Sequence, residues 1–289
     1  ERKSQRFYDD PKNHLYKSFL TLIAELKPKV VLIETVREFL NFGQGKFTSD
    51  LLSRLDELGY YTEYRKLCAA DYGIPQIRHR VFFLASRKTD VDTIGMRPQF
   101  PMPTHSNKLN GHLFINPYRT VADAIKDLPS PVYSHADAQP EYPETKHLSD
   151  LARLLRNSSG KVFNHVARKL SSKSLERICA VGYKRMRDID AHLRTKKFYG
   201  SAYGRLLWDA PALTITTWVY HVGSGRFAHP DEDRAITMRE AARLQSFDDG
   251  YIFPSLINPV SQMIGNAVPP LLAKAFGEEI AKYLEALDN

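Results

Sequence analysis

One carboxylate in the sequence lies where α/β proteins commonly place their chemistry. Residues 30–33 are Val-Val-Leu-Ile, a continuous apolar run typical of a strand covered on both faces, and Glu34 follows at once. The carboxyl ends of parallel strands face the ligand crevice. A carboxyl group there can act as a general acid or base, or pair with the edge of a nucleobase. A helix-capping or surface glutamate is the alternative.

The stretch 72–80, Tyr-Gly-Ile-Pro-Gln-Ile-Arg-His-Arg, joins a turn to a strand-like alternation of polar side chains. Glycine and proline favour the turn, and the alternation places Gln76, Arg78 and Arg80 on one face of the strand that follows. Two guanidinium groups on one face offer fixed donors to carbonyl or phosphate oxygens. A pair of surface salt bridges is the alternative.

A third pattern, Gly-Asn-Ala-Val-Pro-Pro at 265–270, indicates a turn that runs into a helix. Free backbone N–H groups at a helix start bind carboxylates and phosphates, and Asn266 adds a side-chain amide. Ordinary entry into a helix would give the same pattern.

The two cysteines, Cys68 and Cys179, have apolar neighbours and lack the electropositive setting of an activated thiolate, so both are expected in the core. So few cysteines also exclude a disulfide scaffold. No metal is predicted, because the ten histidines show no metal-ligand spacing. The sequence contains neither a G-x-G-x-x-G phosphate-binding loop nor a Walker pattern.

Hydrophobic periodicity predicts the elements that position these residues. The predicted order is a helix from Asp10-Pro11 to Lys27-Pro28, a strand over 30–33, a helix over 48–58, and strands over 60–67 and 81–85. This alternation of strands and helices indicates α/β architecture with a largely parallel sheet.

The chain changes character near residue 95. Eight prolines fall between residues 98 and 143, which excludes long helices and central strands there. Regular signals return at Thr237 and Glu240, which have capping-box spacing, and Pro269-Pro270 opens a final helix. The predicted plan is an α/β body over 1–95, an irregular insertion over 96–245, and a return to the body over 246–289.

The positive charge is confined to one segment. The chain carries a net charge of +8, yet residues 146–205 hold 15 Lys and Arg against 4 Asp and Glu, so the remainder is slightly acidic. Confined positive charge suits a polyphosphate partner such as a nucleic acid, and a solvated basic surface is the alternative. The basic side chains predicted to contact such a partner are Lys184, Arg185, Arg187, Arg194, Lys196 and Lys197.

In this order, the motifs resemble those of the cytosine-C5-specific DNA methyltransferase family. Residues 9–16 resemble D-x-R-G-x-L-F, 28–36 resemble K-P-x-x-x-x-E-N-V, and 71–80 resemble G-x-P-Q-x-R-x-R. Residues 234–247 resemble R-x-x-T-x-R-E-x-A-R-L-Q-x-F, and 265–270 resemble G-N-x-V. The resemblance covers essentially the whole chain, apart from the region between the third and fourth motifs.

The resemblance implies a partial Rossmann-like methyltransferase domain (α/β, mostly parallel sheet) with an inserted, irregular target-recognition domain over 96–245. The implied activity is that of a DNA (cytosine-5-)-methyltransferase, which transfers a methyl group from S-adenosylmethionine to C5 of a flipped-out cytosine in double-stranded DNA. A bacterial restriction–modification enzyme, cytoplasmic and associated with the nucleoid, fits this resemblance.

By resemblance, a cysteine thiolate adds to C6 of cytosine, and negative charge develops toward N3 and O2. Glu34 then takes the N3 and N4 role and Arg80 the O2 role, while Gln76 and Arg78 support the DNA or the catalytic loop. The implied cofactor-contacting positions are Leu15, Asn266 and Ala267, the last through its backbone N–H.

The sequence departs from the family pattern in two ways. Thr35 stands where the family has Asn, and neither the F-x-G-x-G cofactor loop nor a Pro-Cys motif occurs. We therefore expect about the C-terminal two-thirds of such an enzyme, completed by a partner subunit or a further segment that carries the cysteine and the cofactor loop. The alternatives are a non-catalytic DNA-binding or regulatory homologue and a tRNA cytosine-5 methyltransferase. No membrane span is expected, because no apolar run approaches about 18 residues.

Overall fold

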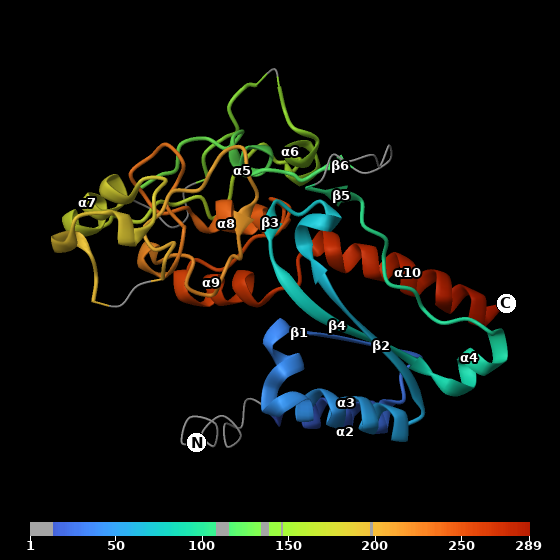
Figure 1. The fold of residues 1–289 in the computed structure, drawn as a ribbon. Coiled ribbons are helices and arrows are strands. Elements are labelled where there is room, and N and C mark those ends of the chain that lie inside the picture. The colour runs from blue at the N-terminus through green and yellow to red at the C-terminus, as the bar shows by residue number, and fades with distance from the viewer. Residues whose placement is uncertain (1–13, 108–115, 134–138, 146, 197–198) are drawn as a thin grey trace. The chain divides into compact units, whose positions relative to one another are not determined.

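The computed structural model describes residues 14–107, 116–133, 139–145, 147–196 and 199–289. The chain divides into two compact units (Figure 1). Unit 1 takes in Glu1–Cys68, His79–Met102 and Ala273–Asn289, and unit 2 takes in Ala69–Arg78 and Pro103–Leu272. Within the described ranges, no helix is long and apolar enough to cross a membrane.

A three-stranded sheet lies at the centre of unit 1. Its order is β1-β4-β2, with β1 at Val30–Val36, β4 at His79–Arg87 and β2 at Tyr60–Cys68. The middle strand is buried from residue 81 to residue 86, as its apolar sequence predicts. All three strands were predicted, and each is longer than its predicted range.

The predicted, largely parallel sheet is wrong for these strands, because β4 runs antiparallel to both of its neighbours. The ten residues Ala69–Arg78 link β2 to β4, and this is too short for the helical crossover that a parallel return requires. The chain therefore reverses and enters the sheet between β1 and β2. Because β1 extends to Val36, Glu34 lies inside the strand opposite Phe82, and not just beyond its end.

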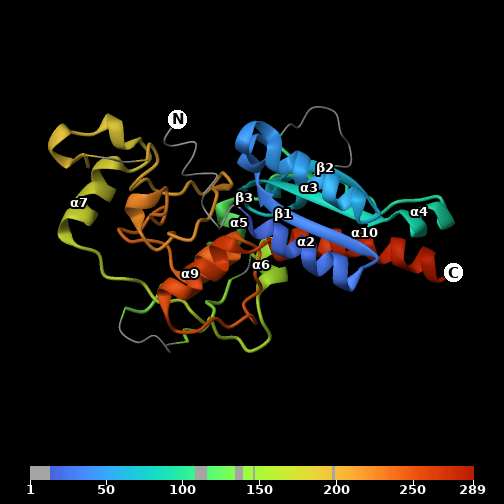
Figure 2. The same cartoon turned by 90° about the horizontal axis from the view of Figure 1, so that it is seen from below.

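Helices cover both faces of this sheet. Helices α2 (Leu15–Leu26) and α3 (Lys46–Glu57) lie side by side on one face, and α10 (Pro270–Asp288) lies on the other (Figures 1 and 2). On the α10 side, the rings of Phe82 and Phe276 pack with centroids 4.8 Å apart. Among the residues that the structure describes, the other helical elements of unit 1 are η2 (Arg37–Gly45) and α4 (Lys88–Ile94). The predicted helix start at Asp10-Pro11 lies outside the described residues.

Unit 2 is built mostly from short elements, as its prolines predict. They are η3 (Ala69–Tyr72), β3 (Gln76–Ile77), β5 (His105–Ser106), β6 (Asn116–Pro117), α5 (Val121–Ile125), α6 (Asp150–Leu155), α7 (Ser172–Val181), η4 (Met186–Asp188), η5 (Ala191–Leu193), β7 (Ala212–Leu213), η6 (Val222–Ser224), α8 (Met238–Leu244) and α9 (Ile257–Asn266). Strand β3 pairs parallel with β7, and β5 pairs parallel with β6. The predicted limits at residues 95 and 245 separate a catalytic body from a target-recognition domain, and they stay predictions.

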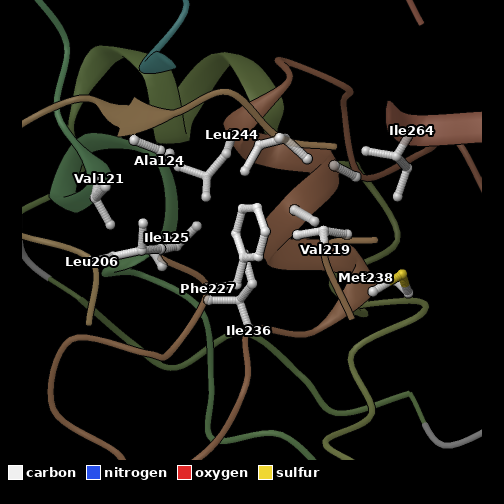
Figure 3. Close-up of a cluster of buried hydrophobic side chains, with 14 of the residues drawn as sticks. Val121, Ala124, Ile125, Leu206, Val219, Phe227, Ile236, Met238, Leu244 and Ile264 are labelled. Carbon is white, nitrogen blue, oxygen red and sulfur yellow. The ribbon is translucent and has the colours of Figure 1, made fainter. Parts of the chain in front are cut away.

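The core of unit 2 joins segments that are far apart in the sequence. Phe227 lies at its centre, among side chains such as Val121, Leu206 and Leu244 (Figure 3). Phe227 is 2% exposed, and helices α5, α6, α8 and α9 all contribute to the cluster around it. Hydrophobic burial of this kind holds together a chain that has little regular structure.

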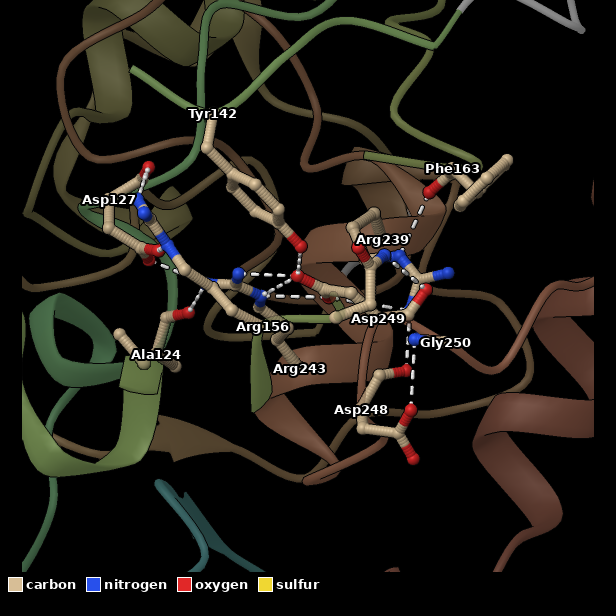
Figure 4. Close-up of polar contacts among 12 residues, drawn as sticks. Ala124, Asp127, Tyr142, Arg156, Phe163, Arg239, Arg243, Asp248, Asp249 and Gly250 are labelled. Atoms are coloured by element: carbon tan, nitrogen blue, oxygen red, sulfur yellow. Dashed lines mark hydrogen bonds and ion pairs between the residues drawn. The ribbon is translucent and has the colours of Figure 1, made fainter. Parts of the chain in front are cut away.

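Helix α8 brings charged side chains into this interior. Its predicted capping box is present, because the Thr237 hydroxyl accepts from the Glu240 N–H and the Glu240 carboxylate accepts from the Thr237 N–H. The Glu240 carboxylate also accepts two hydrogen bonds from Arg234, each 2.8 Å long. Helix α8 itself carries two arginines that are bonded within unit 2 (Figure 4). Arg239 donates to the Asp248 carbonyl, and Arg243 donates to the Asp249 carboxylate.

We predict that replacing Glu240 with Gln destabilises the fold in a pH-dependent way. Burial alone raises the pKa of the Glu240 carboxyl, but the hydrogen bonds and charge of Arg234 outweigh it and lower the pKa from 4.5 to about 2. The folded-state pKa is therefore below the unfolded one. The carboxylate stabilises the fold above about pH 4.5, and this contribution is lost as the pH falls toward 2.

At pH 7, Glu240→Gln should lower the free energy of unfolding by ~3 kcal/mol, because it leaves part of the buried Arg234 charge without its partner. Thermal unfolding at several pH values measures the effect. The difference from the unsubstituted protein should shrink between pH 4.5 and pH 2. Glu278→Gln on the exposed face of α10 is the control and should change nothing. A difference that stays constant over this pH range would contradict the assignment.

Candidate active site

Glu34 and Arg80 form an ion pair across the sheet of unit 1. The register of β1 and β4 sets Arg80 opposite Val36, which places Glu34 diagonally across from it. The Arg80 Nε lies 2.9 Å from the Glu34 Oε1, and the two side chains are 18% and 20% exposed. The Arg80 guanidinium also donates to the His79 carbonyl at 2.9 Å, which fixes its orientation. The structure therefore brings together the two residues that were predicted to be catalytic.

A pocket of about 440 Å³ opens beside this pair, within unit 1. Its lining is mainly aliphatic and aromatic, with one carboxylate. The lining residues are Leu15, Tyr16, Phe19, Ile33, Glu34, Thr35, Val36, Phe39, Phe42 and Leu51. Leu15, predicted to contact the cofactor, and Glu34, predicted to be catalytic, thus share one pocket. Apolar walls with a single charged group are typical of small-molecule sites.

The sequence analysis did not identify Tyr16 as part of this pocket. The Tyr16 hydroxyl donates to Asp50 at 2.5 Å, and Arg54 pairs with the same carboxylate at 2.9 Å. Burial and the Asp50 carboxylate together raise the pKa of Tyr16, so its hydroxyl stays protonated. This chain of bonds ties α2 to α3. The position of Tyr16 directly after Leu15 is the signal that could have identified it.

Gln76 joins its own segment of unit 2 to two others, the end of α8 and the segment around Ile215. Its side chain is fully buried. Its Nε2 donates to the carbonyl of Leu244 at 3.1 Å and to the Gln245 side chain at 2.9 Å, and its Oε1 accepts from the Ile215 N–H at 2.8 Å. Because these groups are used inside unit 2, the structure offers no exposed surface for the predicted contact between Gln76 and DNA.

Arg78 has the same bracing character. It is 2% exposed, and its guanidinium donates to the carbonyls of Ile215 at 3.1 Å, Gly265 at 3.0 Å and Ala267 at 3.4 Å. Its predicted contact with DNA therefore has no exposed surface either. Arg78 instead holds the segment around Ile215 next to the Gly-Asn motif. The other role that the resemblance implies for Arg78, support of the catalytic loop, stays a prediction.

The Gly-Asn motif differs from the predicted turn into a helix. Asn266 is the last residue of α9 and is exposed, and the N–H of Ala267 donates to the Ile264 carbonyl at 3.3 Å. At the start of α10, the N–H groups of Leu271 and Leu272 donate to Ser246 and Pro269. The predicted free N–H groups are thus already bonded. The exposed Asn266 amide is what remains available to a ligand.

The basic segment folds around a small core of its own in unit 2. Met186, Ile189 and Leu193 are buried in that core. The basic residues next to them in the sequence point outward, and Lys184, Arg185, Arg187, Arg194 and Lys196 are all exposed. Lys197 lies outside the described residues. The structure thus presents five of the six predicted contact residues on a surface.

Neither cysteine has the properties of a nucleophile. Cys68 is buried at the end of β2, as predicted. Cys179 was predicted in the core, but it is exposed on α7. The apolar residues of that helix that are buried, Ile178 and Val181, pack on its other face. Partial desolvation of its sulfur, together with the hydrogen bond and charge of the Asp233 carboxylate, raises the pKa of the Cys179 thiol, so it stays protonated.

Solved structures with the same fold are methyltransferases. A putative DNA modification methyltransferase encoded within an E. coli prophage matches with a TM-score of 0.71 and 24% identity, over 96% of this chain and 76% of its own. The Dnmt2 methyltransferase of S. pombe matches with a TM-score of 0.52 and 15% identity, over 97% of this chain and 74% of its own. These likenesses show the fold alone, which is the α/β methyltransferase fold.

The sequence identifies the family. Residues 2–282 match the family described as C-5 cytosine-specific DNA methylase, and the chain belongs to it. The Type II methyltransferase M.AgeI of Thalassovita gelatinovora is 31% identical, over 96% of this chain and 79% of the relative. The Type II methylase M.HgiDII of Herpetosiphon aurantiacus is 32% identical, over 94% of this chain and 70% of the relative. The chain is thus a DNA (cytosine-5-)-methyltransferase, and the methyl donor of its family is S-adenosylmethionine.

We predict that Gly265→Ala destabilises unit 2. A Cβ at this position would lie 2.3 Å from the Thr217 nitrogen and 2.5 Å from the Thr216 carbonyl carbon, and these backbone atoms cannot rotate away. Overpacking of this kind costs ~1–3 kcal/mol in the free energy of unfolding. Urea denaturation measures it. The result expected is a lower midpoint, and an unchanged midpoint would show that the segments are not held as described.

The matched control is Gly277→Ala on α10. No atom lies within 4 Å of a Cβ built there, so the substitution adds no clash. Alanine also has the higher helix propensity, which should raise the free energy of unfolding by ~0.5–1 kcal/mol. The two single variants should therefore change the free energy of unfolding in opposite directions: Gly265→Ala should lower it and Gly277→Ala should raise it.

Proposed function

We propose that Glu34 and Arg80 stabilise the charge that develops on the target cytosine during C5 methylation of double-stranded DNA. The observation that supports this is their 2.9 Å ion pair beside the pocket. N3 and O2 of cytosine are both bonded to C2, so two groups held this close can serve both. The carboxyl group shares a proton with N3, and the guanidinium donates to O2.

The pocket is compatible with S-adenosylmethionine as the methyl donor. Apolar and aromatic walls suit an adenine ring. When bound, the cofactor supplies the methyl group. We propose Leu15, which lines the pocket, as a contact to it. For Asn266, whose amide is exposed, the proposed contact with the cofactor is carried by the resemblance alone. A contact through the Ala267 N–H is less well supported, because that group already donates to Ile264.

We propose that the attacking cysteine comes from outside these 289 residues, from a further segment or a partner subunit. A thiolate nucleophile needs exposure and a lowered pKa. Cys68 is buried, and the pKa of Cys179 is raised. The same segment or subunit would carry the cofactor loop.

The exposed basic side chains of unit 2 are the proposed DNA contact, within a target-recognition domain inserted over 96–245. Positive charge on an exposed surface binds the phosphate backbone regardless of sequence. We propose that a partial Rossmann-like body with this insert acts on chromosomal DNA, in the bacterial cytoplasm at the nucleoid. The relatives named Type II suggest a role in restriction–modification.

The two alternative functions have less support. A homologue that only binds DNA has no use for a partly buried Glu34–Arg80 pair beside an open pocket. The description of the matching family names DNA as the substrate, which favours DNA over tRNA.

Glu34→Gln is predicted to slow methylation by ~10²–10⁴-fold in the enzyme that contains this chain, because an amide cannot supply the shared proton. The measurement is transfer of labelled methyl from S-adenosylmethionine to DNA. Glu38→Gln, an exposed glutamate paired with Arg37, is the matched control and should retain full activity. A rate for Glu34→Gln within a few-fold of the unsubstituted enzyme would remove Glu34 from the reaction.

Neutralising Lys184, Arg185 and Arg187 to Gln should weaken DNA binding and flatten its dependence on salt. Each lost phosphate contact reduces the slope of log K against log salt concentration by ~0.9. Fluorescence anisotropy of a labelled duplex at several salt concentrations measures this slope. Lys274→Gln with Lys282→Gln, both exposed on α10, is the control and should leave it unchanged. An unchanged slope in the triple variant would place the DNA elsewhere.

A further inference from the structure

Trp218 exposes a large aromatic surface on unit 2. It is one of two tryptophans in the chain, and 59% of it is exposed. Tryptophan is normally well buried, and an exposed indole is most often part of a binding surface. No part of the chemistry proposed for Glu34 and Arg80 uses this residue.

The indole belongs to a short row of flat side chains. Its ring stacks on Tyr220 with a centroid separation of 5.8 Å and an interplanar angle of 29°. On Tyr220, the guanidinium carbon of Arg168 lies 5.8 Å from the ring centroid. Arg168 and the next residue, Lys169, are both exposed. The row therefore combines π-faces with positive charge, the combination that binds unstacked nucleobases and their phosphates.

The backbone that carries Trp218 is held from both sides. Its carbonyl accepts from the His221 N–H at 2.9 Å and from the Ser224 hydroxyl at 2.8 Å. The next residue, Val219, is fully buried, and its N–H donates to the Thr216 carbonyl at 3.2 Å. Thr216 in turn packs against Gly265. A side chain on so constrained a turn loses little conformational entropy when it binds.

We propose that Trp218 stacks on a base of the DNA substrate that is exposed when the duplex opens around the target cytosine. In an intact duplex the base faces are covered by their neighbours, whereas an extruded base uncovers the faces next to it. A rigid indole beside Arg168 can cover such a face while the guanidinium neutralises a phosphate. This inference rests on the proposed DNA contact of unit 2.

Intrinsic fluorescence tests the inference, because the chain has two tryptophans only. Trp208→Phe leaves Trp218 as the sole indole, and Trp218→Phe leaves Trp208. Trp208 is partly buried and donates its indole N–H to Asp231 at 2.9 Å, which makes it an internal control. The probes are a fully paired 30-base-pair duplex and the same duplex with one unpaired cytosine.

Stacking on a base should quench the fluorescence of Trp218, and the duplex with the unpaired cytosine should quench it more than the paired duplex. The Trp208 signal should change little with either probe. In binding assays, Trp218→Ala should weaken affinity for the duplex with the unpaired cytosine by about 10-fold, and Trp218→Phe should restore most of it. Equal melting temperatures would show that both variants are folded.

The inference fails if Trp218 is quenched no more than Trp208, or no more by the unpaired than by the paired duplex. It also fails if Trp218→Ala binds as the unsubstituted chain does. In either case the proposed function stands as long as the basic-segment variants lose affinity. If the unsubstituted chain binds neither duplex, the proposed DNA contact itself is wrong. Because the fluorescence test uses the native Trp218, it remains decisive even if Trp218→Ala does not fold.

Discussion

Unit 2 depends on buried guanidinium groups, each of which is hydrogen-bonded through all three of its nitrogens. Arg243 is fully buried and pairs with Asp249 at 2.5 Å and Asp127 at 2.5 Å, while Arg239 donates to the carbonyls of Phe163, Asp248 and Tyr251 (Figure 4). A buried charge is tolerated only when its donors all find acceptors, and removing one partner is costly. These arginines thus act as fixed cross-links between loops that form no sheet. A chain so poor in long elements keeps one conformation because its charged interior permits few others.

This constraint extends from α8 to the surface that carries Trp218. The end of α8 presents the Leu244 carbonyl and the Gln245 side chain to Gln76, and Gln76 in turn holds the Ile215 N–H. Arg78 holds the Ile215 carbonyl from the same motif. The motif therefore fixes the backbone that leads into the exposed aromatic row. Gln76 and Arg78, whose residue types suggest contact with DNA, instead fix the backbone that leads to Trp218.

Local sequence patterns predicted the helices, strands and caps well, but they predicted strand direction and long-range hydrogen-bond partners poorly. The apolar run of β4, the capping box of Thr237 and the proline-initiated α10 were all confirmed, because burial and capping depend on residues close in sequence. The direction of β4 was not predictable from periodicity, since alternation is the same in parallel and antiparallel strands. Nor was the burial of Gln76, since its acceptors lie more than 160 residues away. The sequence pattern indicates that a polar side chain such as Gln76 is functional, and the fold shows whether it faces a ligand or holds segments together.

Burial distinguishes the two kinds of ion pair in this protein. The side chains of the Arg234–Glu240 and Arg243–Asp249 pairs are at most 3% exposed, and they join segments of one interior. Glu34 and Arg80 are each about one-fifth exposed and lie beside a pocket. Water reaches this pair, so exchanging one partner for a ligand atom costs far less desolvation than it would in the interior. A pair that can open at little cost, held on two neighbouring strands, is suited to receive a substrate, whereas the α8 pairs are suited only to hold the fold.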